Sequence, residues 1–231
     1  MKLKILFFVI IIVFFLISIF IFFQKADEDK NPEVILKPEI IQQTESKKIN
    51  GDSLLVQVNK QYCLPQDYVP SGLVHISEYG IPETKDFLLR KIVMPDLEAM
   101  VDQAKQDGVE LRIISAYRSY QNQIETYNYW VDQLGLEEAS RQSALPGCSQ
   151  HQLGTAVDFN ELEFSFTYTS AGIWLSKNAW QYGWVISFPL NSESITGYAY
   201  EPWHYRYIGK DNALKMQKSG LILSKFLEEN N

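Results

Sequence analysis

Two short stretches of this 231-residue chain contain the side-chain types that bind metal ions and catalyse hydrolysis. The first stretch reads SQHQLGTAVD and includes His151 and Asp158, and the second reads EPWH and includes Glu201 and His204. The whole chain has only 3 histidines, and two of them fall within these stretches. Histidines without a shared function would be scattered, so a catalytic zinc site is our first hypothesis.

The spacing of these residues suits such a site. Hydrolytic zinc ions usually have three protein ligands, His and Asp or Glu being common, and keep a fourth position open for water. His151 and Asp158 are separated by six residues, which is enough for a turn, and small residues such as Gly154 let the backbone pass close to an ion. His204 would supply the third ligand from a neighbouring strand. Glu201 could then face the attacking water as a general base.

Simpler interpretations of the same residues stay open at this point. A histidine near a glycine is often a packed or surface side chain, and Asp158 could orient a ligand without binding the metal itself. The pattern Glu-x-x-His also occurs by chance. Spacing alone does not decide between a metal site and these alternatives.

The elements that would position these residues can be predicted from apolar periodicity and from the positions of Gly and Pro. Strands are expected at 111–115, 155–159, 184–188 and 203–208, and helices at 84–106, 121–134, 137–144, 171–182 and from 211 onward. Pro95 is expected to break the first helix or to start a second segment there. Helices alternate irregularly with short strands that cluster late, which favours an α+β domain over a doubly wound sheet.

The N-terminus predicts a membrane anchor in residues 1–23. Lys2 and Lys4 precede an apolar run from Ile5 to Phe23. As a helix this run would rise about 28 Å, close to the hydrocarbon thickness of a bilayer. Cleaved signal peptides usually have shorter apolar regions, of roughly 7–15 residues, and a small-x-small cleavage pattern, which is missing after Phe23. We expect a single-pass anchor with the rest of the chain outside the cytoplasm. Secretion after signal cleavage is the alternative.

Composition sets further limits on the organisation and the partners of the chain. Residues 24–50 are polar and charged and predict a flexible linker, so residues 51–231 are expected to form the catalytic domain. The net charge of -7 argues against nucleic acid as a partner, because phosphate binding needs clustered Lys and Arg. We expect a monomer.

The two cysteines, Cys63 and Cys148, both lie in the part of the chain that is expected to be exported. An oxidising compartment permits a disulfide between them. The bond requires Cα atoms within about 7 Å of one another, a distance that sequence does not give. A bridge and a pair of buried thiols therefore both remain open.

Taken together, the motifs resemble those of a known family. The patterns S-x-H-x-x-G-x-A-x-D at 149–158 and E-P-W-H at 201–204 are similar to the signature of VanY-type D-alanyl-D-alanine carboxypeptidases. Segments at 59–70, 115–123 and 195–198 resemble further parts of that family, and the resemblance extends from Leu54 to the C-terminus. Ala116 is a departure, since the family often has Gly there. Several ordered motifs at compatible spacing are more specific than any one of them.

The resemblance implies a single compact zinc-peptidase domain with a small, mostly antiparallel sheet flanked by helices. It implies one zinc ion per chain, bound by His151, Asp158 and His204, with Glu201 as general base. It also implies that the partner is a peptidoglycan stem peptide ending in D-alanine.

Three further residues match positions that hold the substrate near its C-terminal carboxylate in that family: Arg118, Gln123 and Ser149. A guanidinium suits this task because it forms paired, charge-assisted hydrogen bonds with a carboxylate. An alternative, catalytic role for Arg118 is to stabilise the oxyanion of the tetrahedral intermediate.

We therefore expect a membrane-tethered zinc carboxypeptidase that removes the C-terminal D-alanine from stem peptides, with either D,D- or L,D-specificity. One alternative is a non-catalytic zinc module that binds wall peptides or a protein partner, and the presence of Glu201 disfavours it. Another is a cell-wall endopeptidase, which would need no carboxylate-binding residue such as Arg118.

Overall fold

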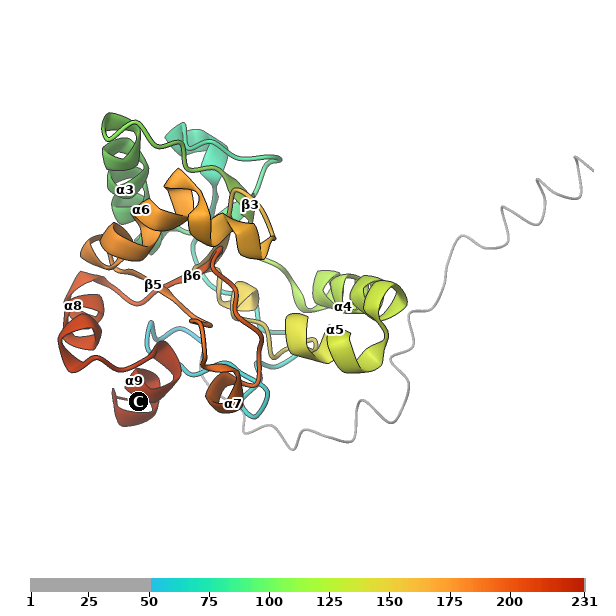
Figure 1. Cartoon of the computed structure of the whole chain (residues 1–231). Coiled ribbons are helices and arrows are strands. Elements are labelled where there is room, and N and C mark those ends of the chain that lie inside the picture. The colour runs from blue at the N-terminus through green and yellow to red at the C-terminus, as the bar shows by residue number, and fades with distance from the viewer. Residues whose placement is uncertain (1–50, 231) are drawn as a thin grey trace, which may run out of the picture. The chain divides into compact units, whose positions relative to one another are not determined.

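A four-stranded sheet at the centre of the domain carries two of the predicted metal ligands (Figure 1). The structure is a computed structural model that describes residues 51–230. The strands are β3 (Ile113–Ser115), β4 (Ala156–Phe159), β5 (Trp184–Ile186) and β6 (His204–Tyr207), in the order β3-β4-β6-β5. All neighbouring strands are antiparallel, which confirms the expected α+β domain with a small antiparallel sheet.

The two faces of this sheet have different side chains, because successive residues of a strand point to opposite sides. Val157 and Phe159 of β4 and Tyr205 of β6 belong to the main hydrophobic core. Asp158 and His204 alternate with these residues and therefore lie on the other face. One face of the sheet thus anchors the fold while the other presents the polar residues.

Helices α3 (Met94–Gln106) and α6 (Ser170–Asn178) cover the apolar face (Figure 1). They contribute buried side chains spaced at intervals of three or four residues, which include Leu97, Met100, Val101, Ala104, Ala171, Trp174 and Leu175. This periodicity places an apolar stripe of each helix against the sheet. Burial of that stripe fixes the strands that carry the predicted ligands.

A second, smaller core joins β5 to the C-terminal helices α8 (Lys210–Ser219) and α9 (Leu223–Asn230). Nearby, the fully buried Arg206 donates from Nη2 to the carbonyl oxygens of Leu54 and Val56 at 3.1 and 2.6 Å. These bonds hold the first described segment of the chain against β6. Burial lowers the pKa of Arg206 to about 9.

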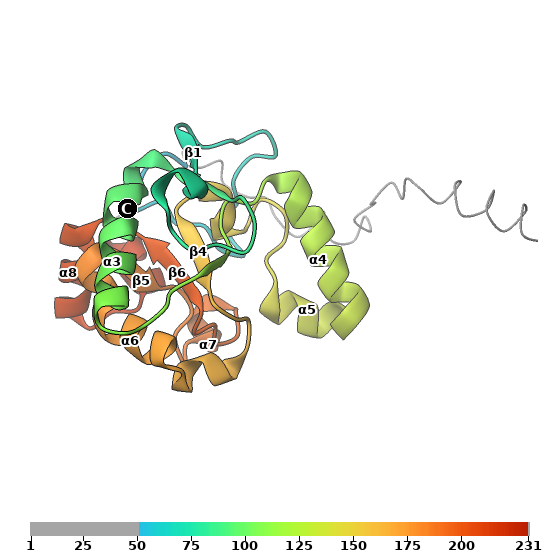
Figure 2. The same cartoon turned by 90° about the horizontal axis from the view of Figure 1, so that it is seen from above.

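Helices α4 (Tyr120–Leu134) and α5 (Leu136–Gln142) form a hairpin that lies to one side of the sheet in both views (Figures 1 and 2). Gly135 separates the two helices, as predicted. The hairpin is tied to the short helix α7 (Glu193–Thr196) by Arg141, which contacts Oε1 and Oε2 of Glu193 at 2.5 and 2.9 Å.

The helical prediction over 84–106 is wrong before Met94, whereas the expected start of a second segment at Pro95 is confirmed. Strand β2 (Leu88–Arg90) pairs with β1 (Leu73–His75), and a 3-10 turn, η2 (Lys91–Val93), leads into α3. Pro95 stands at the first turn of α3, where its missing N–H has no intrahelical acceptor to lose. The remaining 3-10 helices are η1 (Ile76–Tyr79), η3 (Gln150–Leu153), η4 (Phe164–Tyr168) and η5 (Ala179–Tyr182).

Cys63 and Cys148 form a disulfide, which answers the question that the sequence left open. Their Cα atoms are 4.3 Å apart and the two residues are separated by 85 positions. Close by, the N–H of Leu64 donates to the carbonyl of Gly147 at 2.8 Å. The segment before residue 64 is therefore attached directly to the loop that leads into the SQHQLGTAVD stretch.

The predicted anchor, Ile5–Phe23, and the predicted linker, 24–50, lie outside the described residues. Within residues 51–230, no helix is both long enough and apolar enough to cross a membrane.

Candidate metal centre and substrate pocket

Asp158 and His204 meet because they are opposite one another in the β4–β6 ladder. Side chains of such a pair project from the same face with Cβ atoms roughly 4.5–5.5 Å apart. The Oδ1 atom of Asp158 lies 2.9 Å from Nδ1 of His204. The register of two strands, held by the core beneath them, therefore fixes two of the three predicted ligands.

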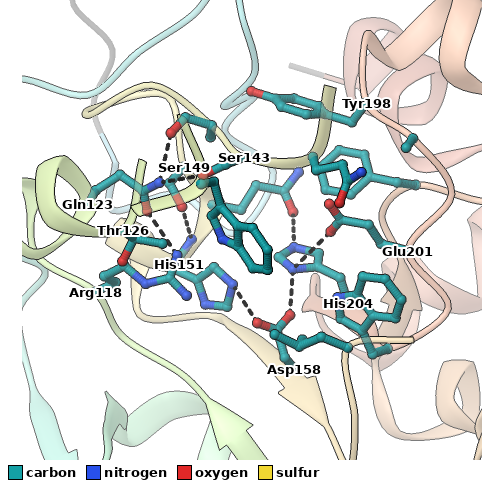
Figure 3. A pocket seen from close by; sticks show the side chains of 18 of the residues that line it. Arg118, Gln123, Thr126, Ser143, Ser149, His151, Asp158, Tyr198, Glu201 and His204 are labelled. Atoms are coloured by element: carbon teal, nitrogen blue, oxygen red, sulfur yellow. Dashed lines mark hydrogen bonds and ion pairs between the residues drawn. The ribbon is translucent and has the colours of Figure 1, made fainter. Parts of the chain in front are cut away.

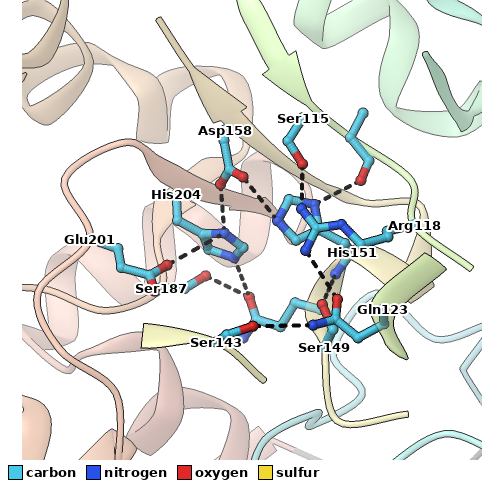
Figure 4. Close-up of polar contacts among 12 residues, drawn as sticks. Ser115, Arg118, Gln123, Ser143, Ser149, His151, Asp158, Ser187, Glu201 and His204 are labelled. Atoms are coloured by element: carbon cyan, nitrogen blue, oxygen red, sulfur yellow. Dashed lines mark hydrogen bonds and ion pairs between the residues drawn. The ribbon is translucent and has the colours of Figure 1, made fainter. Parts of the chain in front are cut away.

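His151 comes from the 3-10 helix η3 and approaches from beside the sheet. The hydroxyl of Ser149 accepts from the backbone N–H of His151 at 3.3 Å and so caps this helix, which ends at Gly154 with a left-handed φ of 66°. The Nε2 atom of His151 lies 3.2 Å from Oδ2 of Asp158 (Figure 4). Asp158 thus stands between the two histidines, as Figure 4 shows.

The three side chains form a group whose nitrogen and oxygen ligand atoms all lie within 4.8 Å of one another. Each residue is at most 5% exposed. Two imidazoles and a carboxylate are a donor set that zinc accepts in hydrolytic sites. The predicted ligands are therefore brought together in a geometry that fits zinc.

The hydrogen bonds of His151 support this fit. Its Nδ1 lies 2.7 Å from the carbonyl oxygen of Ala116, which can only accept, so Nδ1 carries the proton and Nε2 has the lone pair. Burial and, to a smaller extent, Arg118 lower the pKa of His151, although Asp158 opposes them. The Nε2 lone pair of the neutral ring then faces the Asp158 carboxylate, an arrangement that a cation between them would stabilise.

The charge state of Asp158 also suits a metal ligand. Burial by itself would raise the pKa of this carboxyl, but His151 and His204 more than offset that effect and bring the pKa well below its ordinary value. The group is therefore ionised, as a carboxylate ligand must be.

Glu201 lies beside the triad, and its carboxylate is farther from His204 Nδ1 than that of Asp158, which is 2.9 Å away. Its Oε2 is 3.8 Å from Nδ1 of His204, and its side chain is 12% exposed. Burial first, and then the Asp158 carboxylate, raise the pKa of Glu201 well above its ordinary value, while Arg118 acts in the opposite direction. A carboxyl group with a raised pKa at the edge of a metal site suits proton transfer.

Arg118 lies on the opposite side of the same pocket (Figure 3). Its Nη1 donates to Oε1 of Gln123 at 3.0 Å and its Nη2 to the hydroxyl of Ser115 at 2.7 Å. Among the described residues no carboxylate lies within ion-pair distance of this guanidinium, although the side chain is half-buried. A cation that is partly removed from water and has no ion-pair partner is a candidate site for an anion.

Gln123 supports Arg118 from the first turn of α4. It is 1% exposed, and its Nε2 donates to the carbonyl of Ala144 at 2.7 Å. That bond orients the amide oxygen toward Arg118. The predicted substrate contacts of Gln123 and Ser149 remain predictions, because in this structure their polar groups already position Arg118 and His151.

All seven residues selected from the sequence line one pocket of about 170 Å³: Arg118, Gln123, Ser149, His151, Asp158, Glu201 and His204. Its opening includes aromatic side chains, among them Phe164, which stacks on Tyr200 with ring centroids 6.4 Å apart. Pockets for drug-sized ligands are larger, roughly 300–1,000 Å³. The size therefore suits the end of a peptide better than a bulky ligand.

Comparison with known proteins identifies the family. A family model described as VanY, D-alanyl-D-alanine carboxypeptidase, matches residues 86–210, which is more than half of the chain. The chain belongs to the VanY family. The putative carboxypeptidase YodJ of Bacillus subtilis (strain 168) is 37% identical over 220 residues, which cover 89% of this chain and 80% of YodJ.

Two solved carboxypeptidase or pentapeptidase structures are similar to the domain. The LdcB LD-carboxypeptidase superposes with a TM-score of 0.70 at 37% identity, covering 81% of this chain and 95% of LdcB. A second structure is a variant of the vancomycin-resistance D,D-pentapeptidase VanY in complex with Zn(II). It superposes with a TM-score of 0.63 at 30% identity and covers 75% of this chain and 98% of the VanY chain. The VanY family consists of zinc peptidases, so the chain is a carboxypeptidase of this class.

Sequence reasoning missed the groups that hold the site residues in place. Ser115 contacts Arg118, and the carbonyl of Ala116 contacts His151. Gln150 contacts His204, and Ser187 contacts Gln150. Backbone carbonyls have no sequence signature. Gln150, in contrast, stands inside the motif itself, and its position next to His151 was a usable signal.

Proposed function

We propose that this VanY-family protein is a zinc-dependent carboxypeptidase that removes the C-terminal D-alanine from peptidoglycan stem peptides. The observation that carries the proposal is the guanidinium of Arg118, which lies in the same pocket as the metal triad and has no ion-pair partner among residues 51–230. A free carboxylate is the group on a peptide end that such a cation binds. The enzyme would therefore cut next to a chain terminus and not within a chain.

The substrate carboxylate would approach Arg118 from the open side of the pocket. Two of the guanidinium nitrogens already donate to Gln123 and Ser115, which fix its plane. Arg118 thus needs little reorganisation on binding, and the peptide end is oriented before reaction. The scissile bond, one residue from the carboxylate, would then lie between Arg118 and the triad.

His151, Asp158 and His204 would hold the zinc ion. The chemistry that bound zinc supplies is polarisation of the scissile carbonyl and a lower pKa, about 7, for an attacking water. Glu201 would accept the proton from that water and later donate it to the amine of the departing D-alanine. Its raised pKa supports both steps, because it favours holding the proton taken from water until the amine departs.

The Glu201→Gln variant tests this assignment. It keeps the shape of the side chain and removes the base, so zinc should remain bound while D-alanine release is lost. Glu163→Gln, at an exposed carboxylate, serves as a control and should retain activity. Undiminished D-alanine release by Glu201→Gln would refute the assignment. A wild-type protein that binds stem peptide without cleaving it would favour the non-catalytic zinc module.

Specificity for D,D- or L,D-peptides is the finer part of the proposal. The solved relatives include both an LD-carboxypeptidase and a D,D-pentapeptidase. Incubation of the purified domain with matched tetrapeptide and pentapeptide stems, followed by mass spectrometry, distinguishes the two activities. An internal cross-linked peptide without a free carboxylate is the control that tests endopeptidase activity.

We also propose that residues 1–23 anchor the protein in the membrane, with the domain outside the cytoplasm. The support is the apolar run Ile5–Phe23 behind Lys2 and Lys4. Membrane fractionation of the full chain, with protease added to intact spheroplasts, tests this topology. Recovery of a shortened protein from the medium would favour the cleaved signal peptide.

A further inference from the structure

Gln150 is buried within the motif, and its side chain contacts His204 instead of its neighbour His151. Its Oε1 lies 3.1 Å from Nε2 of His204 and accepts from the hydroxyl of Ser187 at 2.7 Å. Gln150 is 7% exposed and Ser187 is 2% exposed. This short chain of contacts lies on the side of His204 that faces away from Asp158.

The contact determines which nitrogen of His204 can bind a metal. An amide oxygen only accepts, so the Nε2 atom that faces Gln150 carries a proton. The lone pair of the neutral ring is then on Nδ1. That atom lies 2.9 Å from Oδ1 of Asp158 and points to the centre of the triad. Gln150 thus favours the tautomer that is able to bind zinc.

Ser187 completes the contacts of Oε1 in this orientation of the Gln150 amide. Its hydroxyl donates to Oε1, and its backbone N–H donates to the carbonyl of His204 at 3.2 Å, so it is attached to the same strand. If the amide were turned over, its NH₂ group would face Nε2 and require the lone pair there. The proton would then be on Nδ1, which could not bind a metal.

We propose that Gln150, held by Ser187, is a positioning residue that strengthens zinc binding by fixing the tautomer and the ring plane of His204. The carbonyl of Ala116 has the same relation to His151, at 2.7 Å from its Nδ1. Groups that accept a hydrogen bond from the second ring nitrogen of a metal-bound histidine usually fix its tautomer and orientation. The inference rests on the proposed zinc site.

Zinc affinity, measured by competition with a chromophoric chelator, tests this role independently of peptidase activity. Gln150→Leu keeps a similar volume and removes the acceptor, so zinc should bind about 10- to 100-fold more weakly. Gln150→Glu has only acceptor oxygens and no NH₂ group that could face the ring. It should therefore bind zinc at least as tightly as the wild type. The zinc affinity of Ser187→Ala should lie between those of the wild type and Gln150→Leu.

Gln152→Leu is the matched control. Gln152 is the same residue type in the same 3-10 helix and is fully buried, but its Nε2 donates to the carbonyls of Pro65 and Tyr68 and not to a ligand. This variant should lose stability and keep its zinc affinity. Equal weakening by Gln150→Leu and Gln152→Leu, or none by Gln150→Leu, overturns the inference.

His204→Ala separates this inference from the proposal on which it rests. If His204→Ala binds zinc like the wild type, the proposed ligand set is wrong and the role of Gln150 is refuted with it. If His204→Ala weakens binding and Gln150→Leu does not, only the role of Gln150 is refuted. Should Gln150→Leu fail to fold, Ser187→Ala decides, and wild-type affinity in that variant counts against the role.

A spectroscopic measurement completes the test. In the zinc-loaded wild type, the Nε2 proton of His204 should give a slowly exchanging imidazole resonance, because it donates to Gln150. The resonance should exchange fast in Gln150→Leu and remain slow in Gln152→Leu. Fast exchange in the wild type would contradict the proposed hydrogen bond.

Discussion

Asp158 and His204 are direct cross-strand partners, with Oδ1 and Nδ1 2.9 Å apart. Their separation is set by the β4–β6 register, because both side chains project from the same face of one ladder. A shift of β6 by one residue would turn His204 into the apolar core and away from Asp158. The packing of Val157 and Tyr205 beneath the sheet therefore protects the metal site as well as the fold.

The Asp158→Asn variant should lose zinc affinity without losing the fold. The amide has the shape of the carboxylate but removes the charge between the two histidines. We expect affinity to fall by more than the roughly 10- to 100-fold typical of outer partners. Chelator competition measures the effect. Asp96→Asn is the control, since Asp96 accepts from Tyr207 and contacts Lys210 on the same domain without touching a ligand.

Arg118→Lys should raise KM for peptides with a free C-terminus. A lysine keeps the charge but cannot form paired hydrogen bonds with a carboxylate, a loss of about 1.5–3 kcal/mol or roughly 10- to 100-fold. Steady-state kinetics on a stem peptide and on its C-terminal amide provide the comparison. If KM rises by the same factor for the free peptide and for its amide, Arg118 does not recognise the carboxylate.

Replacement of Cys63 and Cys148 together by serine should destabilise the domain. The bond closes a loop whose ends are 85 positions apart, and loop entropy for that length gives about 4.5 kcal/mol as an upper value. We expect a loss of about 2–5 kcal/mol in the free energy of unfolding, measured by urea titration. Reductant should affect the wild type in the same way and leave the serine variant unchanged.

Gly154→Ala should be more damaging than Gly80→Ala, although both glycines end a 3-10 helix with a φ of 66°. The left-handed backbone costs a non-glycine residue about 1–2 kcal/mol at either position. A Cβ at Gly154 would also lie 3.1 Å from side-chain atoms of Arg90 and Leu73, whereas nothing lies within 4 Å at Gly80. Thermal unfolding measures the loss of Tm in each variant. An equal loss in both would show that Arg90 and Leu73 move aside freely.

The contacts of Arg141 predict a pH dependence. Hydrogen bonds from Arg141 lower the pKa of Glu193, so the ionised form is favoured in the folded state. Such a group contributes stability above its unfolded pKa and loses it as pH falls through the folded value. The Tm difference between the wild type and Arg141→Leu should be present at pH 7 and shrink as the pH falls below the ordinary range of a glutamate. A difference that is independent of pH would indicate lost packing and not lost charge.

Sequence periodicity predicted most elements, and its main failure has a physical cause. Leu89, Ile92 and Val93 recur at helical spacing, yet Leu89 is fully buried in β2, where it pairs with Val74 of β1. Pairing with a distant strand overrode the local pattern. The expected helix from 211 onward is in fact two helices, because α8 ends at Gly220, which has a left-handed φ of 70°, and α9 begins at Leu223.

The candidate site was more predictable than the fold because its ligands lie in compact motifs. Two short stretches contain the four residues His151, Asp158, Glu201 and His204, so residue type and spacing were enough to suggest a metal site. The supporting groups could not be predicted in this way. The carbonyl of Ala116, for example, reaches His151 only because β3 ends next to η3 in space.

The attachment of the α4–α5 hairpin has a consequence for how the enzyme can vary. Gln123 joins both ends of the hairpin, since it contacts Arg118 before α4 and donates to the carbonyl of Ala144 after α5. The distal turn at Gly135 carries none of these bonds. We therefore expect that turn to accept insertions, deletions or grafted loops while the guanidinium and the metal triad keep their places.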